Sequence, residues 1–310
     1  MKSEIKLLNT EVDGLLMENY KWVSDYRNNK DLRESFNELA IKSFEIDFRG
    51  WYNKGYWNDK YIPYSFVDEG KVIANASIYK ISVVINGKTY NGIQIGTVMT
   101  DIHYRGKGLA KQLLWYIMQL YKDSCDFIYL FANASVLDFY PKYGFIRLDE
   151  SEYSLILKKS SIKRKMDSRL KKLIIEEDLA LLENFAKNRY INSMTLDVKH
   201  NEALLMFYFT VVFSEAIFYI EDLETIVLMK HEEEILHVFD VISLNQQNIE
   251  AVLETIILES TKKVVLHFTP ASLIEGMEVI TMPDDDDALF VLSDKPLLNG
   301  NFKFPITSHC

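Results

Sequence analysis

The sequence lacks most of the features that mark secreted, membrane-spanning and nucleic-acid-binding proteins. Its only two cysteines, Cys125 and Cys310, are too few for a disulfide framework, and the residues after Met1 form no apolar export segment. It also lacks an excess of positive charge. The formal net charge is −10 at pH 7, whereas nucleic acid and anionic lipid attract positive proteins. We therefore expect a cytoplasmic protein with no nucleic-acid or membrane partner, and a cationic acceptor would suit it better.

The sequence has little that suggests a membrane span or a metal site. The apolar run from Ala203 to Ile220 approaches transmembrane length, but Glu215 lies inside it, and its aromatic and β-branched residues favour buried strands. The six histidines show no zinc-like spacing with cysteine or acidic residues. The acidic run Asp284 to Asp287 lacks the alternating ligands of a calcium loop and predicts an exposed turn. We expect no metal.

A turn between a strand and a helix carries the first functional signature. Residues 93–100 alternate and are rich in β-branched side chains, which is typical of a strand, and apolar residues then recur at helical spacing over 109–118. The first N–H groups of a helix have no partner inside it, and the helix dipole adds partial positive charge there. Gly106 and Gly108 let the backbone approach a ligand closely, and the basic residues beside them add charge. The turn therefore predicts a pyrophosphate site.

Two other phosphate-binding motifs do not fit this turn. Leu109 stands where a nucleotide-triphosphatase loop needs serine or threonine. Lys111 stands where a dinucleotide-binding fingerprint needs its third glycine. An ordinary loop is the alternative that remains.

A second signature follows along the chain. It consists of Asn133, Tyr140 and the pair Gly144-Phe145. The pattern predicts a strand over 126–132 and a short helix over 136–143, with a further strand after it. Both signatures therefore follow a predicted strand.

These two signatures resemble the motifs of the GNAT acetyltransferases. Residues 133–145 resemble their Asn…Tyr-x-x-x-Gly-Phe motif, and residues 98–110 resemble their Arg-x-x-Gly-x-Gly/Ala acetyl-CoA motif. The resemblance covers roughly residues 18–157. It implies a mixed α/β sheet, the acyl-CoA N-acyltransferase fold, and acetyl-CoA as co-substrate.

The resemblance also implies which residues hold that co-substrate. Three strand residues run alongside the pantetheine arm, the turn amides hold the pyrophosphate, and two polar residues after the next strand lie near the cofactor. In chain order, these implied cofactor-binding residues are Val98, Met99, Thr100, Arg105, Gly106, Lys107, Gly108, Leu109, Ala110, Lys111, Asn133 and Ser135.

Tyr140 is the candidate catalytic residue. The resemblance implies direct attack on the thioester without an acyl-enzyme, and Tyr140 would protonate the departing thiolate. This fits general chemistry, because a leaving sulfur benefits from a positioned acid and an oxyanion from an amide donor, here most plausibly of Val98 or Met99. The alternative is that Tyr140 only packs in the core, with its hydroxyl bonded locally.

The general base is not evident in the sequence. An alkyl amine with a pKa near 10.4 is almost wholly protonated at neutral pH, so a base is needed. Family members often place a carboxylate on the strand before the cofactor loop, but Gln94 stands there, and Asp101 reads as an exposed loop residue. A water relay or the C-terminal residue stays open. Resembling aminoglycoside acetyltransferases of the enhanced intracellular survival type employ their terminal carboxylate, and Cys310 could do likewise.

The chain is long enough, and at 48% hydrophobic residues apolar enough, for two buried cores. We predict a GNAT domain over 1–158, a linker over 159–172 and a degenerate GNAT-like domain over 173–310. The linker prediction depends on a dense run of basic residues with interspersed serines, which is typical of a solvated segment. Attraction of CoA phosphates or of an acidic partner is the alternative for this run.

The second half repeats the order of elements of the first without its chemistry. The patterns predict a strand over 235–242, a helix over 249–257 and a strand over 263–268. Where the glycine-rich turn should stand, residues 244–249 contain no glycine to let a pyrophosphate approach. We therefore predict that this copy does not bind CoA, and that it either supplies one wall of the acceptor cleft or serves only as scaffold.

The segment from Phe44 to Trp57 is dense in aromatic residues and includes Glu45 and Asp47. In the resembling fold, this region flanks the acceptor cleft, and aromatic faces beside a carboxylate suit a cationic amine. Ordinary core packing with two surface acids explains the segment equally well.

Together, these features predict an acetyl-CoA-dependent N-acetyltransferase that acts on a primary amine of a small molecule or peptide. Two alternatives stay open, a noncatalytic acyl-CoA-binding sensor and an interaction protein with two inert domains. The identity of the acceptor and the oligomeric state cannot be predicted from the sequence.

Overall fold

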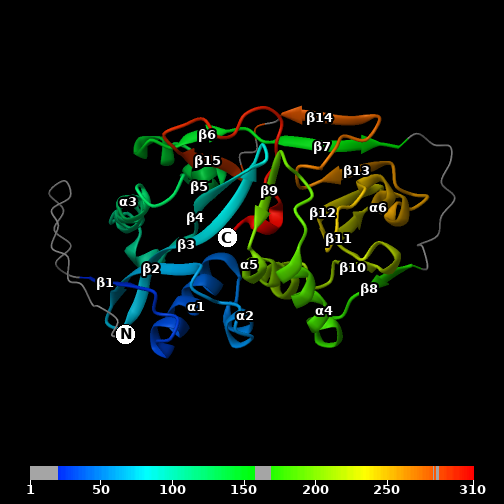
Figure 1. Cartoon of the computed structure of the whole chain (residues 1–310). Helices are drawn as coiled ribbons and strands as arrows, with labels where there is room; N and C mark the ends of the chain where they lie inside the picture. Colours follow the sequence, from blue (N-terminus) through cyan, green and yellow to red (C-terminus); the bar gives the residue numbers. More distant parts are fainter. Residues whose placement is uncertain (1–19, 158–168, 282, 284–285) are drawn as a thin grey trace.

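Two mixed β-sheets lie side by side and carry helices on their faces (Figure 1). The computed structural model describes residues 20–157, 169–281, 283 and 286–310. In spatial order, the first sheet comprises β1 (Lys21–Ser24), β2 (Tyr61–Asp68), β3 (Lys71–Ile85), β4 (Lys88–Thr100), β5 (Phe127–Ala132), β15 (Ala288–Leu292) and β6 (Ile146–Leu148), with β9 (Leu196–Lys199) paired to β3. The second comprises β14 (Met277–Thr281), β7 (Ser151–Ile156), β13 (Lys263–Leu266), β12 (Ile235–Ser243), β11 (Thr225–Glu232), β10 (Ile217–Ile220) and β8 (Leu170–Lys172).

The helices are short, and most of them connect neighbouring strands. The α-helices are α1 (Lys30–Phe44), α2 (Arg49–Asn53), α3 (Leu109–Tyr121), α4 (Ile175–Asn188), α5 (Glu202–Phe207) and α6 (Ile249–Ile256), and a π-helical turn, η4 (Tyr208–Val212), continues α5. The 3-10 turns are η1 (Ile102–Tyr104), η2 (Ala134–Val136), η3 (Tyr140–Tyr143), η5 (Glu221–Leu223) and η6 (Ile306–Ser308).

Helix α3 follows from its sequence pattern. Its buried residues, Leu109, Leu113, Leu114, Ile117 and Met118, recur at spacings of three and four, so they form one apolar stripe against the first sheet. The helix is therefore held by tertiary packing, and its N-terminus is fixed at the end of β4.

The sheets exchange strands across the predicted domain boundaries. Strand β7 lies before residue 158 but pairs with β13 and β14 in the second sheet, whereas β15 lies near the end of the chain and pairs with β5 in the first. The described part of the predicted linker includes β8, and residues 158–168 lie outside the described residues. The domain limits themselves stay a prediction, but the two sheets form one interlocked body.

Two segments differ locally from expectation. The apolar run 203–220 is helical through α5 and η4 and becomes a strand only at Ile217, so the prediction of buried strands was wrong over most of its length. The short helix predicted over 136–143 is instead the two turns η2 and η3, and Pro141, at the start of η3, has no N–H for an intrahelical bond. Among the described residues, no helix is both long and apolar enough to cross a membrane. Cytoplasmic location stays a prediction.

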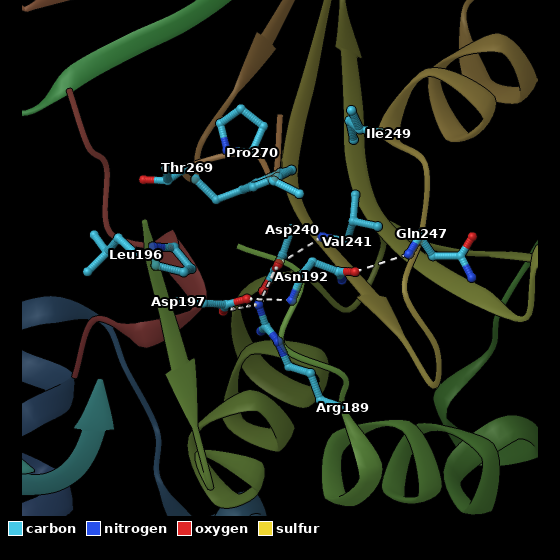
Figure 2. A pocket seen from close by; sticks show the side chains of 13 residues that line it. Arg189, Asn192, Leu196, Asp197, Asp240, Val241, Gln247, Ile249, Thr269 and Pro270 are labelled. Carbon is cyan, nitrogen blue, oxygen red and sulfur yellow. Dashed lines mark hydrogen bonds and ion pairs between the residues drawn. The ribbon is translucent and has the colours of Figure 1, made fainter. Parts of the chain in front are cut away.

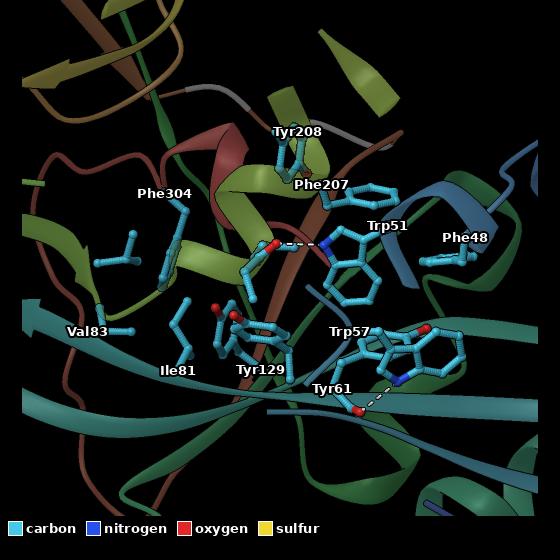
Figure 3. Close-up of a cluster of buried hydrophobic side chains, with 14 of the residues drawn as sticks. Phe48, Trp51, Trp57, Tyr61, Ile81, Val83, Tyr129, Phe207, Tyr208 and Phe304 are labelled. Atoms are coloured by element: carbon cyan, nitrogen blue, oxygen red, sulfur yellow. Dashed lines mark hydrogen bonds between the residues drawn. The ribbon is translucent and has the colours of Figure 1, made fainter. Parts of the chain in front are cut away.

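An aromatic cluster joins the first sheet to elements of the second half (Figure 3). The Trp51 ring lies edge-on to Phe207, and its Nε1 donates a 2.7 Å hydrogen bond to the backbone carbonyl of Ala203. Phe48 stacks on Phe207, with ring centroids 5.3 Å apart. Helix α2 is thereby fixed against α5, which defines one wall of the cavity described below.

The second sheet repeats the arrangement of the first, as the order of elements predicts. Strand β4 leads through α3 to β5, which runs parallel to it, and β12 leads through α6 to the parallel strand β13. Both leading strands also carry an irregular register against their antiparallel neighbours, β3 and β11. The strand, helix, strand repeat is thus confirmed.

Candidate acyl-transfer site

Strands β4 and β5 separate to form a fork. Their parallel pairing ends at Ile95 and Leu130, although β4 continues to Thr100. At this point Thr97 has a φ of 48°, and the register against β3 shifts by one residue, which is the signature of a β-bulge. Past the fork, β4 therefore presents peptide groups toward β5 that no strand among the described residues pairs with.

Polar side chains hold the bulge in place. The Asn75 amide donates to the Thr97 backbone carbonyl at 2.9 Å, and the Tyr61 and Thr97 hydroxyls lie 2.9 Å apart. Burial raises the pKa of Tyr61, so its hydroxyl stays protonated. The fork is a fixed feature of the sheet.

The predicted pyrophosphate turn lies at the end of β4 and opens α3. Gly106 and Gly108 have φ values of 76° and 75°, a region that residues with a side chain rarely adopt, and no atom lies within 4 Å of where a Cβ on either would stand. Gly108 is the N-cap residue, so no side chain caps the first amides of α3, and the first turn has no acidic residue. This helix end is open to an anion.

The basic residues around this turn are exposed. The Lys107 ammonium lies 4.5 Å from the centroid of the Tyr104 ring and bonds the Tyr20 hydroxyl at 3.1 Å, whereas the Arg105 Nε donates to the Thr100 carbonyl at 3.3 Å. Lys111 is exposed in the first turn of α3. Three positive charges therefore surround the uncapped amides.

The other predicted cofactor-binding residues divide into three groups. Val98 and Asn133 line the cavity, one from each arm of the fork, and Ser135 bonds the Asn133 side chain through its backbone N–H at 3.1 Å. Met99 and Leu109 instead bury their side chains in the two cores, so only their backbones are placed to face a ligand. Thr100 and Ala110 are half-buried at the start and end of the turn region.

Tyr140 lines the same cavity from beyond the end of β5. Its ring is buried against Phe145 and Phe290, with centroids 6.0 and 5.5 Å away. Burial raises the pKa of Tyr140 to about 12, so the phenol is protonated throughout the neutral range. It can donate a proton but cannot act as a base there.

The fork opens into a cavity of about 510 Å³. Besides both arms of the fork, its walls come from the aromatic segment before β2, from α5 and η4, and from the last residues of the chain. Most lining side chains are apolar. Those from outside the fork are Phe44, Ile46, Phe48, Trp51, Tyr61, Leu204, Phe207, Tyr208, Val212, Phe213, Asp287, Ile306, His309 and Cys310.

Residues from the second half thus form part of this cavity. The end of the chain lies between the two sheets (Figure 1). A Cβ on Gly96 would stand 1.9 Å from the backbone oxygen of Cys310, so only glycine permits this contact between β4 and the chain end. Burial raises the pKa of the Cys310 thiol, which is therefore uncharged at neutral pH.

Two polar residues in the cavity were not found from the sequence. Asp287 was interpreted as part of an exposed acidic turn, but it lines the cavity and its Oδ2 lies 3.1 Å from Nδ1 of His309. Burial acts to raise the pKa of Asp287, but the hydrogen bond and charge of His309, with Lys303, lower it overall. The two residues are 22 positions apart, and no sequence spacing connects them. Only their approach to the end of β5 brings them together.

Four acidic or amide candidates do not supply the expected base, either because of where they lie or because of their chemistry. Glu45 and Asp47 are exposed outside the cavity lining, and Asp47 bonds Arg49, so neither supplies the carboxylate expected for a cationic amine. Asp101 caps η1 by accepting from the His103 N–H at 3.0 Å. Gln94 lines the cavity with an amide rather than a carboxylate. Among the described residues, no group of three or more His, Cys, Asp or Glu side chains is placed to hold a metal ion.

A second, much smaller cavity of about 30 Å³ lies beside β12 in the second sheet (Figure 2). The buried Arg189 guanidinium bridges Asp197 and Asp240 at 3.1 and 2.8 Å. Asp240 also accepts a hydrogen bond from the hydroxyl of Thr307, which lies in η6. Desolvation by burial raises the pKa of Asp197, whereas Arg189 opposes that change. The charged side chains that line this cavity bond mainly to one another, although Arg189 Nε is buried without a hydrogen-bond partner among the described residues.

Comparisons with known proteins agree with the geometry of the first site. Residues 27–147 match the family model described as "Acetyltransferase (GNAT) domain". This range includes the fork, the glycine turn and Tyr140. This segment is therefore similar to GNAT acetyltransferase domains. No curated protein matches the sequence.

Solved structures extend the likeness to most of the chain. A probable N-acyltransferase from Enterococcus faecalis V583 aligns with 88% of this chain and 72% of its own, at a TM-score of 0.60 and 13% identity. A GCN5-related N-acetyltransferase from Kribbella flavida aligns with 88% of this chain and 71% of its own, at 0.53 and 14%. Eis1 from Mycobacterium abscessus aligns with 87% of this chain and 72% of its own, at 0.54 and 12%. The chain has the acyl-CoA N-acyltransferase fold, with two mixed α/β sheets.

Proposed function

We propose that this protein transfers an acetyl group from acetyl-CoA to a primary amine of a small molecule or peptide. The observation that carries the proposal is the continuity of the site: an uncapped helix end stands at one end of an open strand fork, and a protonated tyrosine stands at the other. An acyl-CoA has the matching parts, a diphosphate, an extended arm able to pair with a strand, and a thioester.

The fork and turn would hold the co-substrate. The amides from Gly106 to Lys111 would bind the pyrophosphate, with positive charge supplied by Arg105 and Lys107. The unpaired edge of β4 from Val98 to Thr100 would pair with the pantetheine arm as an added strand. Asn133 and Ser135 would contact the co-substrate from the opposite arm.

The chemistry would be a direct attack of the amine on the thioester. Tyr140 would give its proton to the departing thiolate, which its high pKa favours because the phenol is present in full at neutral pH. An acyl-cysteine is disfavoured on this chain, because burial raises the pKa of Cys125 to about 11 and also raises that of Cys310. An amide of Val98 or Met99 would stabilise the oxyanion.

The cavity walls support a small acceptor with an apolar body. Among the described lining residues, Asp287 has the only acidic side chain, and none is a lysine or arginine. A polyamine or aminoglycoside carries several charges, each of which would lose its hydration here without a partner. An amine with one charge and an aromatic or alkyl body fits this lining better.

Release of free thiol from acetyl-CoA in the presence of a panel of amines tests the proposal. We expect amine-dependent release, with apolar monoamines ahead of polyamines. A protein whose melting temperature rises with CoA but which releases no thiol with any amine would be a CoA-binding sensor instead. No rise in melting temperature would leave an interaction protein.

A further inference from the structure

The polar groups of the large cavity are concentrated at one place, beside the fork. Asp287 directly precedes β15, whose first residue, Ala288, pairs with Ala132 at the end of β5. His309 approaches the same point from the end of the chain, and its ring stacks on Phe131 with the centroids 3.5 Å apart. Its neighbour Cys310 lies against Gly96 on the other arm of the fork. The imidazole therefore lies between the two arms, where β4 and β5 separate.

Three contacts fix the backbone that carries this imidazole. The Tyr208 hydroxyl donates to the His309 carbonyl at 2.7 Å. Thr307 donates to Asp240, and the Ser308 hydroxyl donates to the Pro305 carbonyl at 2.6 Å. The histidine is thus held by elements of both sheets, so its position is determined by the assembled fold.

The hydrogen bonds of the ring assign its tautomer. Nδ1 lies 3.1 Å from the Asp287 carboxylate, which can only accept, so Nδ1 carries the proton. Nε2 of the neutral ring then holds a lone pair. Among the described residues, Nε2 is buried and has no hydrogen-bond partner. A buried acceptor without a donor is rare in folded proteins and indicates a missing partner.

We propose that Asp287 and His309 form the acceptor subsite, in which Nε2 of His309 binds the ammonium group of an apolar primary amine and takes its proton. This inference rests on the acyl-transfer function proposed above and supplies its missing base. Asp287 orients the ring and stabilises the imidazolium that forms.

With these residues, every proton and electron pair of the reaction is accounted for. Nε2 takes one proton from the ammonium, and the nitrogen lone pair so freed forms the C–N bond at the thioester carbonyl. The C–S bond breaks, its electron pair leaves on sulfur, and the sulfur takes the Tyr140 proton. The second proton lost by the nitrogen restores the Tyr140 phenol. One amide, one free thiol and one proton on His309 result, and that proton passes to solvent.

The surroundings of the subsite select the class of acceptor. The walls opposite the fork are aromatic and aliphatic, from Phe48, Trp51, Phe207 and Val212 among others. Asp287 supplies the one acidic side chain of the lining, and it is already bonded to His309. An acceptor with a single amino group on an aromatic or alkyl body, such as an arylalkylamine, satisfies both features.

The kinetic test uses the full chain, with phenethylamine as acceptor and His309→Gln as the variant. We expect kcat/KM at pH 7 to fall about 100-fold or more, the usual contribution of a positioned base. The deficit should shrink as the pH rises, because the free amine fraction grows about tenfold per unit below the amine pKa. Calorimetric affinity for acetyl-CoA should not change, which shows that the variant is folded. His200→Asn, at an exposed site, is the matched control.

The other titratable groups around His309 are Asp287, Tyr208, Cys310, Glu150 and Lys303. Of these, Asp287 is the partner in the proposal, so Asp287→Asn should shift the pH profile in the same direction as His309→Gln. Wild-type rate and pH profile in His309→Gln would overturn the proposal, as would faster turnover of spermidine than of phenethylamine.

A binding measurement tests this inference separately from the acyl-transfer proposal. If the wild-type protein turns over no amine, the transferase assignment fails, but calorimetry of phenethylamine still decides the subsite. We expect the wild-type chain to bind phenethylamine and to bind phenethyl alcohol at least tenfold more weakly, and His309→Gln to weaken amine binding by a similar factor. No binding of the amine, or equal binding by the wild type and His309→Gln, would overturn the subsite.

Discussion

The same strand, helix, strand unit occurs twice in this chain, once open and once closed. In the first, β4 and β5 part after Ile95 and Leu130, and a cavity of about 510 Å³ follows. In the second, the parallel pairing of β12 and β13 ends at Val238 and Leu266, and the neighbouring cavity is about 30 Å³. The backbone plan is shared, so the difference lies in the side chains.

The helix ends differ in the same way. Helix α3 begins at Gly108, without a side-chain cap and without an acidic residue in its first turn. Helix α6 begins at Asn248, whose side chain accepts from the Glu250 N–H at 2.8 Å, and Glu250 itself places a carboxylate there. One helix end is open to an anion, whereas the other is capped by its own chain and repels one.

The residues after the last parallel pair continue the contrast. Gly96 follows Ile95 in β4, and its missing side chain leaves room for Cys310. Phe239 follows Val238 in β12 and stacks on Phe213 with centroids 4.4 Å apart. At this position a phenylalanine side chain fills the second unit, whereas the first unit has only glycine. This supports our proposal that the second unit is a degenerate copy, kept as a wall of the first site.

The largest effect is expected at the open helix end. Gly108→Val adds a β-branched side chain at a φ of 75° and fills the space that a phosphate would use, so affinity for acetyl-CoA should fall tenfold or more by calorimetry. Gly300→Val is the matched control, because Gly300 has a φ of 74° and equally open surroundings. A similar loss of acetyl-CoA affinity in both variants would show that backbone strain, rather than phosphate contact, is responsible.

Tyr140→Phe should act on the rate alone. The change removes a proton donor with a pKa of about 12 from the open fork, so kcat should fall about 100-fold while acetyl-CoA affinity stays nearly constant. Tyr143→Phe, in the same turn η3, should leave kcat unchanged. An unaltered kcat in Tyr140→Phe would remove the tyrosine from the mechanism.

In the second, closed unit, removal of a buried charge should lower the stability of the protein. Arg189→Met leaves the buried Asp197 and Asp240 without their cation, and the free energy of unfolding should fall by about 3–5 kcal/mol. Arg49→Met breaks exposed ion pairs with Glu34 and Asp47 and should cost less than about 1 kcal/mol. Urea unfolding measures both free energies. An equal decrease in the two variants would contradict the view that buried charges hold the second fork.

A smaller, pH-dependent effect is expected from His267, which follows Leu266 at the second fork. Burial, with the charge of His237, lowers the pKa of His267 to about 4, below the ordinary value of about 6.5. Between these two values the unfolded chain binds more protons than the folded one, so stability should fall as the pH is lowered through this window. Relative to His267→Phe, the wild type should lose about 2 kcal/mol between pH 7 and pH 5. Parallel curves for the two proteins would mean that folding does not lower the pKa of His267.

The comparison also explains what the sequence could predict. The turn at Gly106 and Gly108, the strands beside it and the repeated order of elements depend on local patterns, and they were predicted within a few residues. The exchange of β7 and β15 between the sheets depends on pairing between distant segments, which no local pattern records. Strong β-propensity over 203–220 likewise gave way to helix under tertiary packing.

The site was predictable to a similar extent. Tyr140 and the cofactor turn belong to short motifs with fixed spacing, so they could be named in advance, although their roles stay a prediction. Asp287 and His309 belong to no motif and meet only because β15 begins, and η6 ends, beside the end of β5. The expected carboxylates, Glu45 and Asp47, were chosen for their aromatic neighbours, but their side chains are exposed outside the cavity.

The stoichiometry of acetyl-CoA binding to the full chain tests the central contrast most directly. One unit is open and the other is capped and filled, so calorimetry should give one molecule bound per chain, and Gly108→Val should weaken that single event. Two molecules per chain, or no binding at all, would contradict the account.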